Sequence, residues 1–166
     1  MSKSPTLKQL KAELITPENF QRYGQVIFPT DDGKEFDQND AQLNLQNGIP
    51  RFYIMQLNKR GLKFYNIARH VLCTQCLGAL EGKDWYMAVC PANNNSDKPH
   101  LEEMSAFHIP GNCFIKLNEG TWHAGPYFTH DVVNFYNLEL SNTNIVDFFT
   151  YDFLKQDQIE FEMVGV

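Results

Sequence analysis

Two histidines, His70 and His123, are the residues of this sequence best suited to chemistry. The imidazole side chain exchanges a proton near neutral pH and is a common metal ligand. His123 lies in the stretch 120–126, Gly-Thr-Trp-His-Ala-Gly-Pro, between two segments with the aromatic and β-branched residues typical of strands, 114–117 and 132–138. With a glycine on each side, His123 is predicted to point into the concave face of a sheet. The alternative is a core histidine that is hydrogen-bonded on a tight turn.

The stretch around His70 has a spacing that resembles the first motif of the cupin barrel. That motif runs Gly, five residues, His-x-His, three or four residues, Glu, six residues, Gly. With His70 at the second His position, Gln75 falls at the Glu position and Gly82 at the closing Gly, while Ala68 replaces the first His.

The second cupin motif, Pro-x-Gly-x-x-His, fits Gly120 and His123, with Asn118 in place of the usual Pro. His70, Gln75 and His123 would then offer two imidazoles and one amide oxygen to a divalent ion such as Zn, Ni, Mn or Fe. Because glutamine lacks the charge of glutamate, such an ion would be held weakly. A metal-free pocket lined by the three side chains is therefore preferred to a metal site.

Short segments with strand character, separated by turns, must position these side chains. Between them, Thr16 and Pro17 are typical of a helix start, and Gly24 is predicted to end the turn at 18–23 in a left-handed conformation. The predicted strands are 7–14, 25–28, 43–45, 52–57, 64–68, 85–90, 104–109, 113–117 and 132–138, with one or two more around 142–144 in a tail that ends in polar residues.

This pattern predicts an all-β fold, a cupin-like double-stranded β-helix or jelly-roll barrel with one or two short helices. The 166 residues are expected to form one domain, 1–166, with flexible ends at 1–6 and 165–166. Because side chains alternate along a strand, Arg69 is expected to face away from His70.

The composition argues against several partners. Lys and Arg number 14 against 20 Asp and Glu, and the resulting net charge of −6 disfavours nucleic acid and anionic membrane, which both attract basic surfaces. No segment has the ~18 consecutive apolar residues of a membrane span, and the first eight residues lack the apolar stretch of a secretory signal. A cytoplasmic protein is expected.

The four cysteines are predicted to be reduced thiols. Cys73 and Cys76 form a C-x-x-C pattern, but the redox version of that pattern sits where a strand leads into a helix, and the surroundings here have strand and turn character. In an alternating strand Cys73 shares a face with Gln75 and Cys76 does not. Buried or half-buried thiols are therefore expected.

Four stretches resemble the ureidoglycolate lyase family, formerly called ureidoglycolate hydrolases, whose members are cupin-like β-barrels. Residues 14–27 are similar to its opening "LTPEAF…YGDVI", residues 69–75 to "ERHPLGTQAF", residues 105–107 to "RAF", and Trp122-His123 to its late Trp-His pair. The segments 117–126 and 135–144 are closest to plant and cyanobacterial relatives, which carry "LNxGTWHAGP" and "FYNLELSNTN".

The resemblance implies an enzyme that splits ureidoglycolate, or a similar small hydroxy-acid derivative, into urea and glyoxylate. His70 and His123 would act as general acid and base, and Glu139 is a candidate second base. Gln75 would bind the amide or hydroxyl groups of the substrate, and Trp122 would line the same pocket. The substrate carboxylate needs a cation, for which Lys116 and Arg51 are the candidates.

A second interpretation stays open. After Trp122-His123 the bacterial lyases have His-Pro-Leu, whereas this chain has Ala124-Gly125-Pro126. The protein could therefore be a non-catalytic or differently acting cupin that binds a small molecule, with or without a divalent metal. In both interpretations the family resemblance implies a homodimer.

Overall fold

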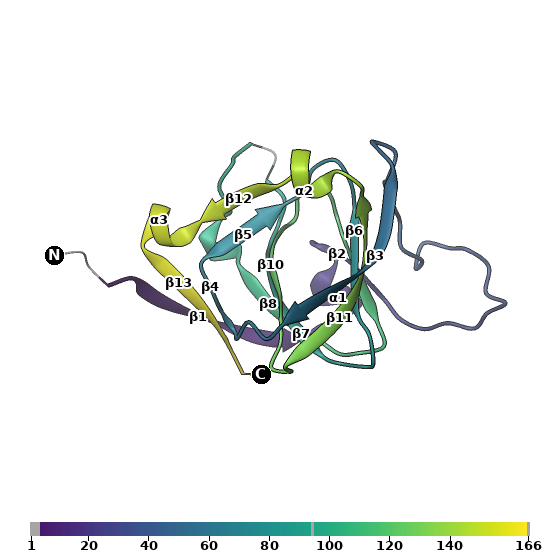
Figure 1. Cartoon of the computed structure of the whole chain (residues 1–166), viewed down its shortest axis with the longest axis horizontal. Helices are drawn as coiled ribbons and strands as arrows, with labels where there is room; N and C mark the ends of the chain where they lie inside the picture. Colours follow the sequence, from purple (N-terminus) through teal and green to yellow (C-terminus); the bar gives the residue numbers. More distant parts are fainter. Residues whose placement is uncertain (1–3, 94, 166) are drawn as a thin grey trace.

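Two β-sheets that pack against each other form the protein, as described by a computed structural model for residues 4–93 and 95–165 (Figure 1). The larger sheet has eight strands in the order β12 (Phe149–Asp152), β5 (Asn66–Arg69), β10 (Trp122–Tyr127), β7 (Trp85–Cys90), β8 (Ser105–Ile109), β1 (Thr6–Leu14), β13 (Ile159–Val164) and β4 (Lys63–Phe64). The smaller sheet has five, in the order β2 (Gly24–Ile27), β9 (Phe114–Leu117), β6 (Gln75–Ala79), β11 (Val132–Leu140) and β3 (Pro50–Asn58).

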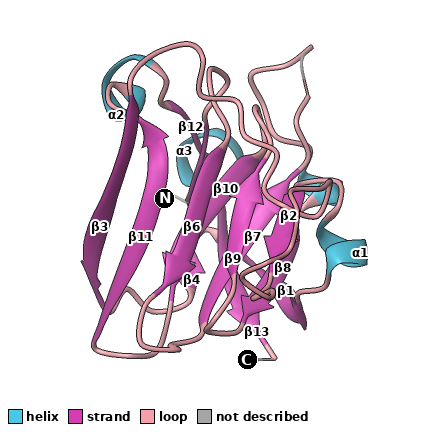
Figure 2. Ribbon diagram, turned by 90° about the vertical axis from the view of Figure 1, so that its right-hand side faces the viewer, coloured by secondary structure: helices cyan, strands magenta, loops and turns pink. Residues whose placement is uncertain are grey.

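Strand pairing is mostly antiparallel, as expected for a jelly-roll-like barrel. Only β1, among the described strands, pairs in parallel, with β13 on one side and β8 on the other. Figure 2 shows the long strands β3, β11 and β6 side by side in one sheet, with β10, β7 and β8 in the other. The prediction of an all-β, jelly-roll-like fold is confirmed.

The core lies on both faces of the larger sheet. Along β7, Trp85, Met87 and Val89 belong to the hydrophobic cluster between the two sheets. The alternate residues Tyr86 and Ala88 belong to a second cluster with β13 and α3 (Phe153–Asp157). A strand buried on both faces is apolar at every position, which explains why residues 85–90 form an unbroken hydrophobic run.

The helices are few and short. Besides α3 they are α1 (Pro17–Phe20), α2 (Thr143–Val146) and the 3₁₀ turn η1 (Leu101–Glu103). Thr16 caps α1 as predicted, in a reciprocal capping box with Asn19. No described helix combines the length and the apolar run that crossing a bilayer would need.

Several element predictions are wrong in detail. Residues 122–127, which are absent from the predicted strands, form β10 and pair with β7. Residues 43–45 form no strand, and the predicted strand 64–68 is broken at Tyr65 into β4 and β5.

The tail also differs from its prediction. Residues 143–146 form α2 rather than a strand, and the segment that was predicted as a polar end forms β13, which pairs with β1. Of the ends predicted to be flexible, 1–3 and 166 lie outside the described residues, whereas Thr6 already belongs to β1.

Gly24 has a different role from the one predicted. The C-cap of α1 is Gln21 in a right-handed conformation, and Gly24 is the first residue of β2. A Cβ at this position would lie 1.8 Å from the carbonyl oxygen of Lys116. The glycine is therefore required by the close approach of β2 to β9 rather than by a left-handed turn.

Candidate functional site

A cavity of about 160 Å³ lies between the smaller sheet and β10. Its volume suits a small molecule rather than a single water. Inward-facing side chains of β3, β6, β10 and β11 form its walls, together with Asn144 of α2 and Phe148 just after it. The polar side chains among them are Tyr53, Arg60, His70, Gln75, His123, Asn137, Glu139 and Asn144.

The two histidines lie side by side at this cavity, as predicted. Their ring centroids are 5.2 Å apart, and both residues are buried. Nδ1 of His70 lies 2.5 Å from the carbonyl oxygen of Asp147, and Nδ1 of His123 lies 3.2 Å from that of Thr121. Because a carbonyl oxygen only accepts, Nδ1 is the donor in each of these two contacts, and the Nε2 atom of each ring takes part in neither.

Burial keeps His123 in its neutral form. Desolvation is the main cause that lowers the pKa of His123 to about 3, and the neighbouring imidazole of His70 lowers it further, against the hydrogen bond to Thr121. At neutral pH the Nε2 of His123 is therefore a proton acceptor rather than a donor.

Gln75 presents an unsatisfied oxygen beside the two rings. Its Nε2 donates to Asn137 Oδ1 and to Glu139 Oε2, both at 3.1 Å. A carboxylate can only accept, so this contact fixes which end of the amide is nitrogen. The Oε1 of Gln75 is buried without a hydrogen-bond partner. Leaving such a group unpaired costs about 1–3 kcal/mol, so Oε1 is an acceptor that awaits a donor from a ligand.

Glu139 is held by a full set of donors. Besides Gln75 and Asn137, its carboxylate accepts from Asn144 Nδ2 at 3.1 Å and from the Tyr53 hydroxyl at 3.3 Å. Only 1% of its surface is exposed. Glu139 therefore orients Gln75 through their hydrogen bond, and its role as a second base stays a prediction.

Asp147, just after α2, orients His70. Its carbonyl oxygen accepts from the ring, while its carboxylate accepts from the backbone amides of Val71 and Leu72 at 2.8 Å each. No sequence signal points to this residue, because the contact joins segments that are 77 positions apart.

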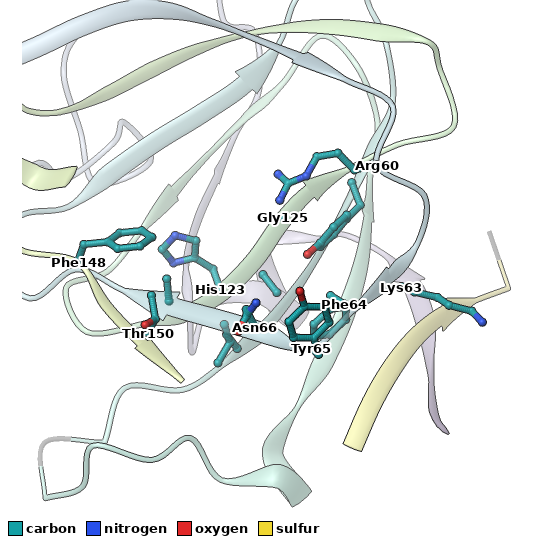
Figure 3. A pocket seen from close by; sticks show the side chains of 13 residues that line it. Arg60, Lys63, Phe64, Tyr65, Asn66, His123, Gly125, Phe148 and Thr150 are labelled. Atoms are coloured by element: carbon teal, nitrogen blue, oxygen red, sulfur yellow. The ribbon is translucent and has the colours of Figure 1, made fainter. Parts of the chain in front are cut away.

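A second, larger hollow of about 460 Å³ adjoins the cavity (Figure 3). The two share Arg60, His123, Gly125 and Phe148. Residues of β4, β5, β10 and β12 line the larger hollow, among them Tyr65, Asn66, Tyr127 and Thr150. His123 therefore stands at the junction of the two spaces.

Lys116 and Trp122, which were expected to bind the substrate, do not line the cavity. Lys116 lies opposite Cys76, one position out of phase with Gln75, and its Nζ bonds to Asn118. Trp122 is fully buried in the second hydrophobic cluster, where the guanidinium of Arg69 stacks 4.4 Å from its ring. This contact confirms that Arg69 faces away from His70.

Arg51 lies just outside the cavity. Its guanidinium carbon is 3.7 Å from the centroid of the Tyr53 ring, and Nη1 is 4.0 Å from Glu139 Oε1. It is therefore engaged with two residues of the wall, although neither contact excludes an approaching ligand.

The three residues predicted to hold a metal lie together, but they form a poor site for a divalent ion. They offer two imidazoles and one amide oxygen, and the carboxylate of Glu139, which bonds to Gln75, already accepts from four donors. Among residues 4–93 and 95–165, no group of three or more His, Cys, Asp or Glu side chains has the geometry to bind a metal.

All four cysteines are buried free thiols, as predicted. Cys73 contacts Thr143, on the side of Gln75, and Cys76 faces Lys116. Burial raises the pKa of the Cys73 thiol, and raises that of Cys76 to about 12. Both are therefore protonated at neutral pH, which does not suit a redox role.

Two sheets around a polar internal cavity with a histidine pair place this chain in the class of jelly-roll-like β-proteins. The sequence pattern of the family described as ureidoglycolate lyase matches residues 7–152. Because this match covers most of the chain, the protein belongs to the ureidoglycolate lyase family. Its closeness to plant and cyanobacterial members stays a prediction.

Other comparisons add little. A search of curated proteins finds no match. Among solved structures, a dTDP sugar isomerase from Desulfovibrio desulfuricans G20 is similar, with 12% sequence identity, a TM-score of 0.48, and coverage of 78% of this chain and 82% of that one.

Proposed function

We propose that the protein is a ureidoglycolate lyase-like enzyme that releases urea and glyoxylate from ureidoglycolate or a similar small hydroxy-acid derivative. Family membership supports this kind of function. The observation that carries the specific reaction is the pair of histidine rings, with centroids 5.2 Å apart, that lies with the unpaired Gln75 oxygen at a cavity of about 160 Å³.

The reaction needs one proton to be moved. A base takes the proton of the carbinol hydroxyl, the oxygen forms a carbonyl bond with its carbon, and the bond from that carbon to the urea nitrogen breaks. The departing nitrogen then receives a proton, so no proton is gained or lost overall. Positioned proton transfer of this kind contributes roughly 10²–10⁴-fold to the rate.

His123 is the proposed base, because burial keeps its ring unprotonated. An anionic substrate in the cavity favours the protonated imidazole, so substrate binding raises the basicity of His123. The imidazolium then returns the proton to the urea nitrogen, directly or through His70. Gln75 Oε1 accepts a hydrogen bond from a urea N–H, which satisfies an otherwise unpaired group.

Release of urea and glyoxylate by purified protein tests this proposal, with the spontaneous decay of ureidoglycolate subtracted. The second candidate is a cupin that binds a small molecule without this activity. Saturable binding of ureidoglycolate, with no urea release above background, would favour it. Elemental analysis of the same preparation tests the metal-dependent form of that candidate, which requires about one divalent ion per chain.

We also propose that the protein is cytoplasmic and forms a homodimer with no nucleic-acid or membrane partner. Four buried unpaired thiols are compatible with a reducing compartment. The homodimer rests on the family resemblance, and sedimentation at micromolar concentration tests it against a single species of about 19 kDa.

A further inference from the structure

The proposed function leaves one substrate group without a partner, the carboxylate. A carboxylate taken out of water needs a cation or several donors. Of the basic residues that the sequence suggested, Lys116 bonds to Asn118 on the other side of its sheet. Arg51 stacks on Tyr53 and does not line the cavity.

Arg60 is a cation that the sequence analysis did not select. It follows the end of β3 and lines both the inner cavity and the larger hollow. Figure 3 shows its guanidinium directed into the hollow, toward the side on which His123 lies. The guanidinium carbon is 5.0 Å from the centroid of the Tyr127 ring, a cation–π contact that holds the side chain over the junction.

The charge of Arg60 is not neutralised by the protein. Within the part of the chain that the structure describes, no carboxylate lies within 4.0 Å of its guanidinium nitrogens. Lys63 is the other described cation of the larger hollow, and it does not line the inner cavity. Arg60 is therefore the described cation shared by both spaces, in a protein whose net charge is −6.

We propose that Arg60 binds the substrate carboxylate and makes the site select small 2-hydroxy carboxylates over their neutral amides. The planar guanidinium can donate two parallel hydrogen bonds to a carboxylate, which fixes orientation as well as position. When Arg60 holds the carboxylate, the rest of a small ligand lies where the two spaces meet. It is then beside His123 and next to the inner cavity that Gln75 lines. This inference rests on the proposed function for the identity of the full substrate, but the selectivity does not depend on turnover.

Binding of glycolate and of its neutral counterpart glycolamide, measured by NMR titration, tests this selectivity. For the wild-type protein we expect glycolate to bind at least about tenfold more tightly. Arg60→Gln should remove most of that preference and leave glycolamide binding unchanged, which also shows that the variant is folded. Lys59→Gln, which removes the neighbouring exposed charge outside both spaces, is the matched control and should retain the preference.

Three results would overturn the inference. One is a wild-type protein that does not bind glycolate in preference to glycolamide. Another is an Arg60→Gln variant that keeps the preference for glycolate. The third is that Arg51→Gln, and not Arg60→Gln, loses this preference. Because no turnover is measured, failure of the lyase reaction and failure of the Arg60 assignment give different results.

Discussion

At the scale of single residues, the site depends on which groups are left without a partner. Glu139 is surrounded by donors, so its neighbours Gln75 and Asn137 are oriented by it. Among the described residues Gln75 Oε1 has no hydrogen-bond partner, and the two histidine rings bond to backbone carbonyls through Nδ1. The groups that a ligand can use are therefore those that the hydrogen-bond network leaves open.

Glu139→Gln should disturb this network without removing a base. The new amide nitrogen would face donors, either from Gln75 and Asn137 or from Asn144 and Tyr53, which leaves at least one buried donor unpaired. We expect a loss of about 1–3 kcal/mol in the free energy of unfolding, and a melting temperature lower by roughly 2–4 °C per kcal/mol.

Thermal unfolding of this variant beside Glu13→Gln, a change at an exposed strand position, measures the difference. Equal melting temperatures for the two variants would show that Glu139 has no orienting role. If activity disappeared while the melting temperature stayed at the wild-type value, Glu139 would instead be the base.

The residues of the site differ in how far the sequence can predict them. His70, Gln75 and His123 follow from motif spacing, and Asn137 could have been found from Glu139, because residues two apart on a strand share a face. Asp147 and Arg60 lie in connecting segments, where no periodicity fixes the direction of a side chain. Their roles depend on contacts between distant parts of the chain.

At the scale of elements, β10 was the least predictable from local signals. Glycine and proline at 125 and 126 disfavour a strand, yet Trp122, His123 and Ala124 pair in register with β7. The register shifts between Ala124 and Tyr127, so the irregular residues fall at a bulge within the strand. Pairing with a central strand therefore outweighs local propensity here, and it turns His123 to the cavity and Trp122 to the core.

The contact of β2 with β9 predicts a sensitive glycine. Gly24→Ala would place a methyl group 1.8 Å from the carbonyl oxygen of Lys116, so the strands must move apart. We expect a loss of about 1–3 kcal/mol in the free energy of unfolding, and a larger loss if the strand pair cannot adjust.

Gly33→Ala is the control for this change, because a Cβ at Gly33 meets nothing within 4 Å. Urea denaturation of both variants gives the comparison, and the control should lie within about 0.5 kcal/mol of wild type. A Gly24→Ala protein as stable as the control would contradict the described approach of the two strands.

At the scale of the whole molecule, the fold could be predicted because its two-residue alternation and turns recur along most of the chain. The order of the strands in the sheets could not be predicted. β1, near the start of the chain, pairs with β8 and with β13, which are far from it in the sequence. The buried ring of His123 also makes global stability depend on pH.

Stability should fall as the pH is lowered from about 6.5 toward 3. An unfolded histidine has a pKa near 6.5, whereas burial lowers that of His123 to about 3, so the unfolded chain binds more protons over this interval. The contribution of His123 is on the order of 3–5 kcal/mol between these limits. Denaturation midpoints across this range should decrease less steeply in His123→Asn than in wild type, and parallel curves would contradict neutral burial of the ring.

The most direct test of the account is the rate of urea release from ureidoglycolate by wild type, His123→Asn and His100→Asn, measured side by side. His100 is exposed and lines neither space, so it controls for loss of an imidazole elsewhere. The account predicts activity above the spontaneous rate for wild type and His100→Asn, and a decrease of roughly 10²-fold or more in His123→Asn. Equal rates for all three proteins, at or above background, would contradict it.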